Sequence, residues 1–288
     1  MNKAPDNLDR ITDELLSEIG TVEGFLSENE MRFLALLAAC PTADGEVIEI
    51  GSFKGRSTII LARMAGLAGN GPINAVDPMN APSETDPDLG DAGSSLPDFE
   101  KNLERFGVRH RVRFFQKTSS EMAREWSGPI RLLWIDGDHT YEGTRRDLEC
   151  FEPHLADGAI VAFHDVLHEF EGGARVFAEN VLLSTRYGAC GFVGSIAWAQ
   201  FCDDELESVR FRELKLRLYR RLARLIPYVS LGAKLSGFQK KKYKLLRSMV
   251  PHGPMDNEVW TGFVSDKKRN LSVRESNVET ANPANDKN

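Results

Sequence analysis

Two segments of this sequence place aspartate carboxylates next to histidine imidazoles, a combination that can bind a metal ion or accept a proton. IDGDH contains Asp136 and His139, and AFHDV contains His164 and Asp165. Such groups can bind a hard divalent cation, or one of them can act as a general base. A lone histidine is more often structural, but two of only six histidines adjoin aspartates here. We therefore interpret the two segments as parts of one candidate site.

A third segment, EIGSFKGRST, reads as a glycine-containing turn between an apolar run and a helix start. Gly51 and Gly55 permit unusual backbone angles and close approach of a ligand to the main chain. A P-loop is excluded because the second glycine comes one residue early and Arg56 replaces the lysine. The G-x-G-x-x-G dinucleotide fingerprint is also missing. The pattern that fits is the E-x-G-x-x-x-G loop of S-adenosylmethionine enzymes, which begins at Glu49.

An acidic residue in the right place supports adenosine binding by this loop. Asp77 ends the next apolar run, 26 residues after Gly51, where a carboxylate can accept hydrogen bonds from ribose hydroxyls. The alternative is an ordinary Asp-Pro turn. Ser119 follows a later run at the expected adenine edge, although it could equally belong to a helix N-cap. The predicted cofactor contacts are Glu49, Gly51, Ser52, Gly55, Ser57, Asp77, Ser119 and Asp136.

The elements that must position these residues alternate along the chain. Short apolar runs rich in β-branched or aromatic residues predict strands, with helical patterns between them. Such alternation predicts an α/β fold with a doubly wound sheet. The expected strands are 46–51, 73–78, 111–116, 130–136 and 159–166, and the expected helices are 56–67, 95–106, 119–126 and 141–155, after helical residues 7–40 that include a Ser27–Glu30 capping box.

Charge and cysteine content narrow the class of protein. The formal net charge is −7, yet residues 209–250 contain 13 basic residues and one acidic residue. The four cysteines are widely spaced, which favours a reduced protein over a disulfide framework. The N-terminus is polar and no apolar run is long enough to span a bilayer. We expect a cytoplasmic protein.

The quoted motifs also carry a family resemblance. From about Glu23 to Phe201 the chain resembles class I S-adenosylmethionine-dependent methyltransferases, through EIGSFKGRST, VDP, IDGDHTYEGTRRDLECFEPHLADGAIVAFHDV and VGSIAWAQF. Within that class it is similar to metal-dependent sugar O-methyltransferases of macrolide biosynthesis and to cephalosporin-hydroxylase-like proteins. The resemblance implies a Rossmann-like, mostly parallel seven-stranded sheet, in which VGSIAWAQF is a late antiparallel strand.

The resemblance also implies roles for the two segments. Asp136 and Asp165 match metal ligands, His139 matches the general base, and His164 stands where relatives often place an acidic ligand. The expected cofactors are S-adenosylmethionine and a divalent cation, with Mg²⁺ favoured. The expected reaction is methylation of a hydroxyl of a sugar, glycan or glycolipid. The alternatives are a phenolic or natural-product acceptor, or a non-catalytic binding module.

The resemblance divides the chain into four parts. We predict N-terminal helices at 1–40, an S-adenosylmethionine-binding methyltransferase domain at 41–205, a basic helical appendage at 206–250 and a polar, largely disordered tail at 251–288. Residues 79–95 read either as a surface loop or as a lid over the site.

The sequence does not determine what the basic segment 209–250 contacts. One interpretation is an interfacial helix on anionic lipid, at the inner face of a membrane. Another is a helix pair that packs on the acidic catalytic half of the same chain or of a partner chain, as in a homo-oligomer. Nucleic acid ranks last because no RNA-binding motif interrupts the segment.

Overall fold

The structure is a computed structural model, and most of the chain is described. The described residues are 5, 7–69, 71–80, 94–168, 170–230 and 235–260. The predicted lid, residues 79–95, falls largely outside them.

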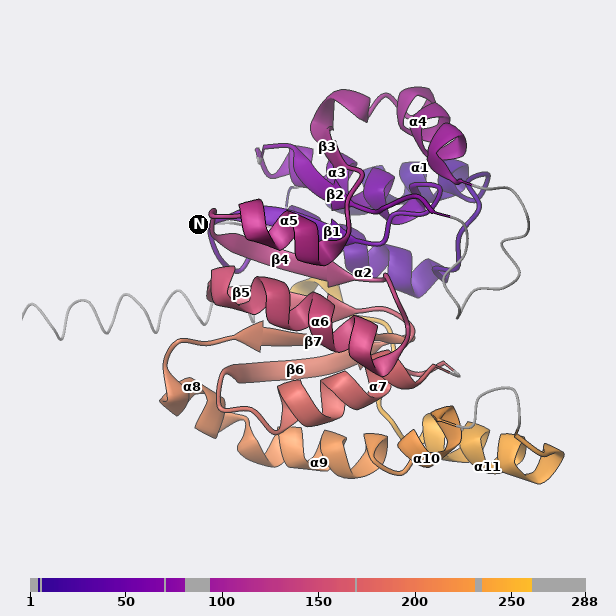
Figure 1. The fold of residues 1–288 in the computed structure, drawn as a ribbon, viewed down its shortest axis with the longest axis vertical. Coiled ribbons are helices and arrows are strands. Elements are labelled where there is room, and N and C mark those ends of the chain that lie inside the picture. The colour runs from indigo at the N-terminus through magenta and orange to yellow at the C-terminus, as the bar shows by residue number, and fades with distance from the viewer. Residues whose placement is uncertain are drawn as a thin grey trace, which may run out of the picture.

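A seven-stranded sheet forms the centre of the molecule (Figure 1). Its order is β3-β2-β1-β4-β5-β7-β6, and only β7 runs antiparallel to its neighbours. The expected α/β doubly wound fold is confirmed, and VGSIAWAQF does supply the antiparallel strand. The strands are β1 (Glu46–Ile50), β2 (Ile73–Val76), β3 (Val112–Phe115), β4 (Ile130–Ile135), β5 (Leu155–Phe163), β6 (Tyr187–Val193) and β7 (Ile196–Phe201). Of these, β6 was not predicted.

Helices cover both faces of the sheet because successive strand side chains point to opposite faces. On β4, Leu132 and Trp134 join the core under α1 to α4, whereas Leu133 and Ile135 join the core under α5 to α7. The first face carries α1 (Leu8–Ile19), α2 (Glu28–Ala39), α3 (Arg56–Leu67) and α4 (Leu96–Arg105). The second carries α5 (Ser119–Glu125), α6 (Tyr141–Phe151), α7 (Glu171–Val176) and the π-helix η4 (Phe177–Leu182). The short 3₁₀ turns are η2 (Arg109–Arg111) and η3 (Glu152–His154).

The basic appendage packs beside β6 and η4 through an unusual buried lysine. Lys215 donates from Nζ to the carbonyls of Ser184 and Tyr187 and to Oγ of Ser208, at 2.6, 2.7 and 2.7 Å. Burial lowers the pKa of this amine, and the three acceptors compensate for its lost hydration. This contact agrees with the interpretation in which the basic helices pack on the catalytic half. The helices are α8 (Glu205–Arg210), α9 (Arg212–Leu222), α10 (Ile226–Val229) and α11 (Gly237–Ser248).

Residues 251–260, the start of the tail predicted to be largely disordered, are described by the structure. Trp260 is almost fully buried, and its ring packs edge-on against Phe33 and Trp198. Its indole nitrogen donates to the carbonyl of Cys40 at 3.2 Å. The burial of one large aromatic ring outweighs the polarity of the preceding residues. Residues 261–288 lie outside the described part. No helix among the described residues is both long and apolar enough to cross a membrane.

Candidate active site

Four of the predicted site residues stand at the carboxyl edge of the sheet, each directly after a parallel strand. Backbone hydrogen bonds extend the ladder to them: Gly51 donates to Val76, Asp136 to Ile50 and His164 to Ile135. Asp77 likewise donates to Phe115. The strand order reverses between β1 and β4, so Gly51 and Asp136 flank the topological switch point, where open α/β sheets bind ligands.

The turn after β1 lies against the end of β4. A Cβ at Gly51 would stand 2.1 Å from the carbonyl oxygen of Asp136, and Gly51 has φ = 84°. Gly55 also has a positive φ, 88°, and begins α3 in the left-handed conformation. Both glycines are therefore required by backbone angle, as the sequence predicted, and Gly51 is also required by space.

Asp77 holds this turn in shape. Its Oδ2 accepts from the backbone N–H groups of Ser52 and Phe53, at 2.7 and 3.0 Å, and its Oδ1 accepts from Met79 at 2.6 Å. Asp77 therefore does more than form an Asp-Pro turn, because its carboxylate also accepts hydrogen bonds from the turn after β1. A carboxylate has about four acceptor positions, so these three bonds leave room for a ribose hydroxyl. That contact stays a prediction.

Glu49, Ser52 and Ser57 are buried beneath the turn rather than exposed in it. Oε2 of Glu49 accepts from Ser52 and from Thr58, at 2.9 and 2.6 Å. Burial raises the pKa of Glu49 to about 7, against the lowering effect of the three neighbouring hydroxyls. The side chains fix the turn to the start of α3, so a cofactor is expected to meet the backbone of the turn.

Among the residues that the structure describes, three other than glycine have positive φ, and all three lie in this region. Phe53, Met79 and Asp165 have φ values of 47°, 53° and 57°. Each such conformation costs about 1 kcal/mol or more and persists only where the surroundings impose it. Their location after β1, β2 and β5 marks this edge of the sheet as a functional site.

The segments IDGDH and AFHDV meet at this edge, but the three residues whose ligand atoms converge are not the three predicted metal ligands. Ligand atoms of Asp136, His139 and Asp165 all lie within 4.8 Å of one another. His139 Nε2 is 3.8 Å from Oδ2 of Asp165, and its ring stacks on Phe170 with centroids 4.6 Å apart. Two carboxylates and one imidazole suit a divalent cation, so these residues fit one.

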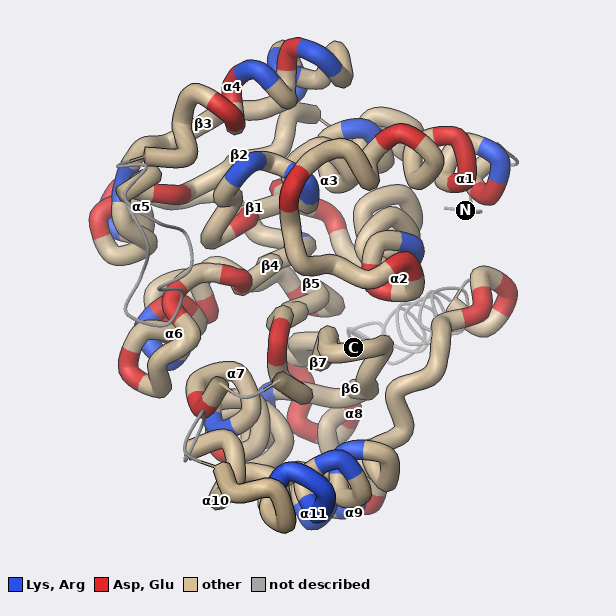
Figure 2. Tube along the Cα trace, turned by 90° about the vertical axis from the view of Figure 1, so that its right-hand side faces the viewer, with Lys and Arg blue, Asp and Glu red and all other residues tan. Residues whose placement is uncertain are grey.

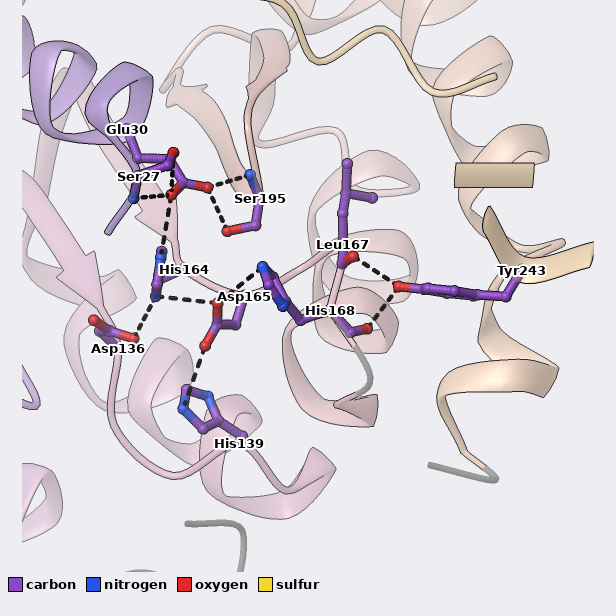
Figure 3. A network of polar contacts seen from close by, with 10 residues as sticks. All are labelled: Ser27, Glu30, Asp136, His139, His164, Asp165, Leu167, His168, Ser195 and Tyr243. Carbon is purple, nitrogen blue, oxygen red and sulfur yellow. Dashed lines mark hydrogen bonds and ion pairs between the residues drawn. The ribbon is translucent and has the colours of Figure 1, made fainter. Parts of the chain in front are cut away.

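His164, the third predicted ligand, lies outside this converging group, between its two aspartates and Glu30 (Figure 3). Its Nδ1 lies 3.0 Å from Oδ1 of Asp136 and 3.3 Å from Oδ1 of Asp165. Its Nε2 faces Oε2 of Glu30 at 3.9 Å, an ion-pair distance. Burial opposes a charge on the ring, but the neighbouring carboxylates raise the pKa of His164 well above its usual value. In this structure His164 therefore bridges carboxylates, and His139 takes its place in the cluster.

Glu30 lies next to the cluster, although the sequence predicted only a helix-capping role for it. It forms the expected capping box with Ser27, whose N–H it accepts at 2.7 Å. Its other oxygen accepts from the N–H and Oγ of Ser195, in the β6–β7 turn, at 2.5 and 2.6 Å. Burial would raise the pKa of Glu30, but the nearby imidazole of His164 and the hydrogen bonds from Ser195 and Ser27 lower it overall. The capping pattern was the only feature of the sequence that singled out Glu30, and it did not predict the contact with Ser195.

Ser119 occupies the start of α5 but turns inward. Its Oγ donates to Oδ1 of the buried Asp147 at 2.5 Å, while Thr118 forms the N-cap with Glu121. The N-cap alternative is therefore confirmed for Thr118, and contact between Ser119 and adenine stays a prediction. Asp147, to which the sequence assigned no role, packs close to the backbone after β4: a Cβ added at Gly137 would stand 3.2 Å from Oδ2 of Asp147.

Asp147 should make stability depend on pH. Burial raises its pKa from 3.8 to about 6, although Ser119 opposes the shift. The folded state thus holds this proton more tightly than the unfolded chain, so the contribution of Asp147 to stability falls as pH rises from about 4 to 6. We expect Asp147→Asn to raise the free energy of unfolding at pH 8 by about 1–3 kcal/mol. Urea unfolding between pH 4 and 8 would measure this gain, which should shrink toward pH 4.

The matched control for this prediction is Asp203→Asn, at an exposed carboxylate. Its unfolding free energy should follow that of the unsubstituted protein at every pH. A gain for Asp147→Asn that was equal at pH 4 and pH 8 would show that Asp147 does not carry the pH dependence.

Comparison with known proteins agrees with this geometry. Residues 48–166 match a family described as a methyltransferase domain. A protein from Klebsiella pneumoniae assigned as an O-methyltransferase has a similar structure, with 21% identity, a TM-score of 0.50, and 68% of this chain and 90% of that chain covered. The calicheamicin methyltransferase CalS11 is similar at 18% identity and a TM-score of 0.50, with 69% and 92% covered. Residues 48–166 thus match a methyltransferase domain, and the chain has the α/β fold of class I S-adenosylmethionine-dependent methyltransferases.

Proposed function

We propose that this chain is an S-adenosylmethionine-dependent O-methyltransferase. The observation that carries the proposal is the meeting of the Gly51 turn with the Asp136, His139 and Asp165 cluster at one switch point of the sheet. Such an arrangement places a bound cofactor beside a group that can accept a proton. When bound, S-adenosylmethionine supplies a methyl group on a cationic sulfur.

The turn and its acidic neighbours supply the cofactor site. A ligand at this edge would meet the strained backbone of the turn and the remaining acceptor positions of Asp77. Asp136, whose side chain is about one-fifth exposed, adds negative charge near the expected position of the cationic sulfur.

His139 supplies the base. Its Nε2 would accept the proton of the acceptor hydroxyl, and the resulting imidazolium would lie 3.8 Å from Asp165, which stabilises the charge. Stacking on Phe170 restricts the ring, so proton transfer would require little reorientation. His164 and Glu30 position the cluster, since His164 contacts Asp136 and Asp165 on one side and Glu30 on the other, and they take no direct part in the transfer.

A divalent cation is the alternative use of the same cluster. Asp136, His139 and Asp165 would hold it, because their ligand atoms converge within 4.8 Å. The cation would lower the pKa of a hydroxyl bound beside it. In this arrangement His139 would be a ligand, and another group would accept the proton.

The acceptor in this proposal is a hydroxyl of a sugar, glycan or glycolipid. The resemblance to sugar O-methyltransferases supports this class, and the calicheamicin methyltransferase shares the fold. A phenolic or natural-product hydroxyl is the alternative acceptor. A non-catalytic module is disfavoured because Asp136, His139 and Asp165 are all present and close together.

Calorimetric titration tests the proposal most directly. S-adenosylmethionine should bind saturably, whereas NAD and ATP should not. A panel of sugar and phenolic acceptors, with S-adenosylhomocysteine as the measured product, would then define the acceptor. Binding of NAD or ATP alone would overturn the proposed cofactor and, with it, the reaction.

A further inference from the structure

The appendage presents a cationic surface at one end of the molecule. Figures 1 and 2 both place α9 and α11 at this end, and Figure 2 shows basic residues along each of them. Glu213 is the single acidic residue between positions 209 and 250. The α11 lysines are all exposed. These are Lys240, Lys241, Lys242 and Lys244.

An apolar stripe runs along the same exposed side of α11. Phe238, Leu245 and Met249 are 77%, 64% and 47% exposed. They are spaced by seven and four residues, so they share one face of the helix. Lys241 and Lys242 flank this stripe on its two sides at helical spacing. A helix with an exposed apolar stripe and basic flanks is typical of one that lies in a bilayer interface.

The opposite face of α11 is fixed to the catalytic half. Tyr243 is buried, and its hydroxyl donates to the carbonyls of Leu167 and His168, at 2.7 and 2.9 Å (Figure 3). Beside the stripe, Lys242 lies over the ring of Tyr228 in α10, 5.7 Å from its centroid. The stripe is therefore exposed on a helix that is itself anchored, close to the turn that carries Asp165.

We propose that α11 is a docking helix for an anionic lipid surface. Its lysines complement anionic headgroups, and Phe238, Leu245 and Met249 enter the boundary between headgroups and acyl chains. The exposed α9 residues Arg217 and Arg220 add positive charge at the same end of the molecule. Lipid is favoured over nucleic acid because Leu245 and Met249 gain nothing from contact with phosphates or sugars. The proposal does not depend on methyl transfer.

Vesicle flotation of the full chain tests this docking. The protein should bind vesicles that contain phosphatidylglycerol and should bind phosphatidylcholine vesicles at least about tenfold more weakly. Phe238→Ser/Leu245→Ser/Met249→Ser should lower the partition coefficient at least about tenfold while every lysine remains. Lys240→Gln/Lys241→Gln/Lys244→Gln should lower it about a hundredfold, since each basic residue contributes about fivefold.

A matched control comes from α8. Leu206 and Val209 are 69% and 58% exposed, but glutamates at 205 and 207 adjoin them. Leu206→Ser/Val209→Ser should leave vesicle binding unchanged, and circular dichroism should show that all variants are folded. Equal binding by the serine-substituted stripe and the unsubstituted protein would overturn the proposal. So would tighter binding to an RNA or DNA oligonucleotide that the stripe substitutions leave unaltered.

Discussion

His139→Ala should lower kcat for methyl transfer about a thousandfold, within the range by which a positioned general base accelerates a reaction. The affinity for S-adenosylmethionine should stay within about twofold, because the turn that would meet the cofactor does not depend on His139. The side chain of His139 faces Asp165 across 3.8 Å and stacks on Phe170. The alanine variant therefore lacks the proton acceptor, while the backbone hydrogen bonds at the strand ends stay in place. Single-turnover formation of S-adenosylhomocysteine would measure the loss.

A control substitution and a titration with metal ions distinguish between His139 as the general base and His139 as a metal ligand. His110→Ala removes an exposed histidine from η2 and should leave kcat unchanged. Calorimetric titration with Mg²⁺ or Mn²⁺ then distinguishes base from ligand. If His139 is the base, the alanine variant keeps its affinity for the cation; if it is a ligand, that affinity falls with the activity. Full activity in the variant would remove His139 from the mechanism.

The sequence predicted the strand ends well because local patterns determine them. The five runs that end at Gly51, Pro78, Gln116, Asp136 and Val166 are all strands. The strands of four of them are mostly buried, and β3, at the edge of the sheet, is partly exposed. β6 escaped prediction because Gly188 and Gly191 weaken its pattern. Gly191 fits because the indole of Trp198, on β7, fills the space of a side chain.

The contacts within the site could not be read from sequence patterns. Glu30 and Ser195 are 165 residues apart, and Glu30 is the group that draws Nε2 of His164 away from the cluster. A local pattern predicts which residues reach the edge of the sheet, but the direction of each ring depends on such distant partners. The sequence therefore predicted a cluster of aspartates and histidines, while the choice between His139 and His164 required the structure.

Gly51→Ala should remove binding of S-adenosylmethionine. An added Cβ would stand 2.1 Å from the carbonyl oxygen of Asp136 and 2.8 Å from Cα of Gly137, both of which are backbone atoms. The turn or the end of β4 must therefore move, and each carries part of the proposed site. We expect the free energy of unfolding to fall by about 3–5 kcal/mol, since strain at φ = 84° adds to the collision. Calorimetric titration should show at least about a hundredfold loss of affinity, as cofactor enzymes require backbone geometry at this turn.

Gly69→Ala separates the effect of space from that of backbone angle. Gly69 has a similar φ of 70°, but nothing lies within 4 Å of an added Cβ. It follows α3 at its far end, away from the turn, so its substitution should cost only the strain of about 1 kcal/mol and leave the affinity unchanged. Equal losses of affinity in the two variants would mean that global destabilisation, and not the approach of the Gly51 turn to β4, controls binding. A loss confined to Gly51→Ala would identify this approach as the feature that shapes the cofactor site.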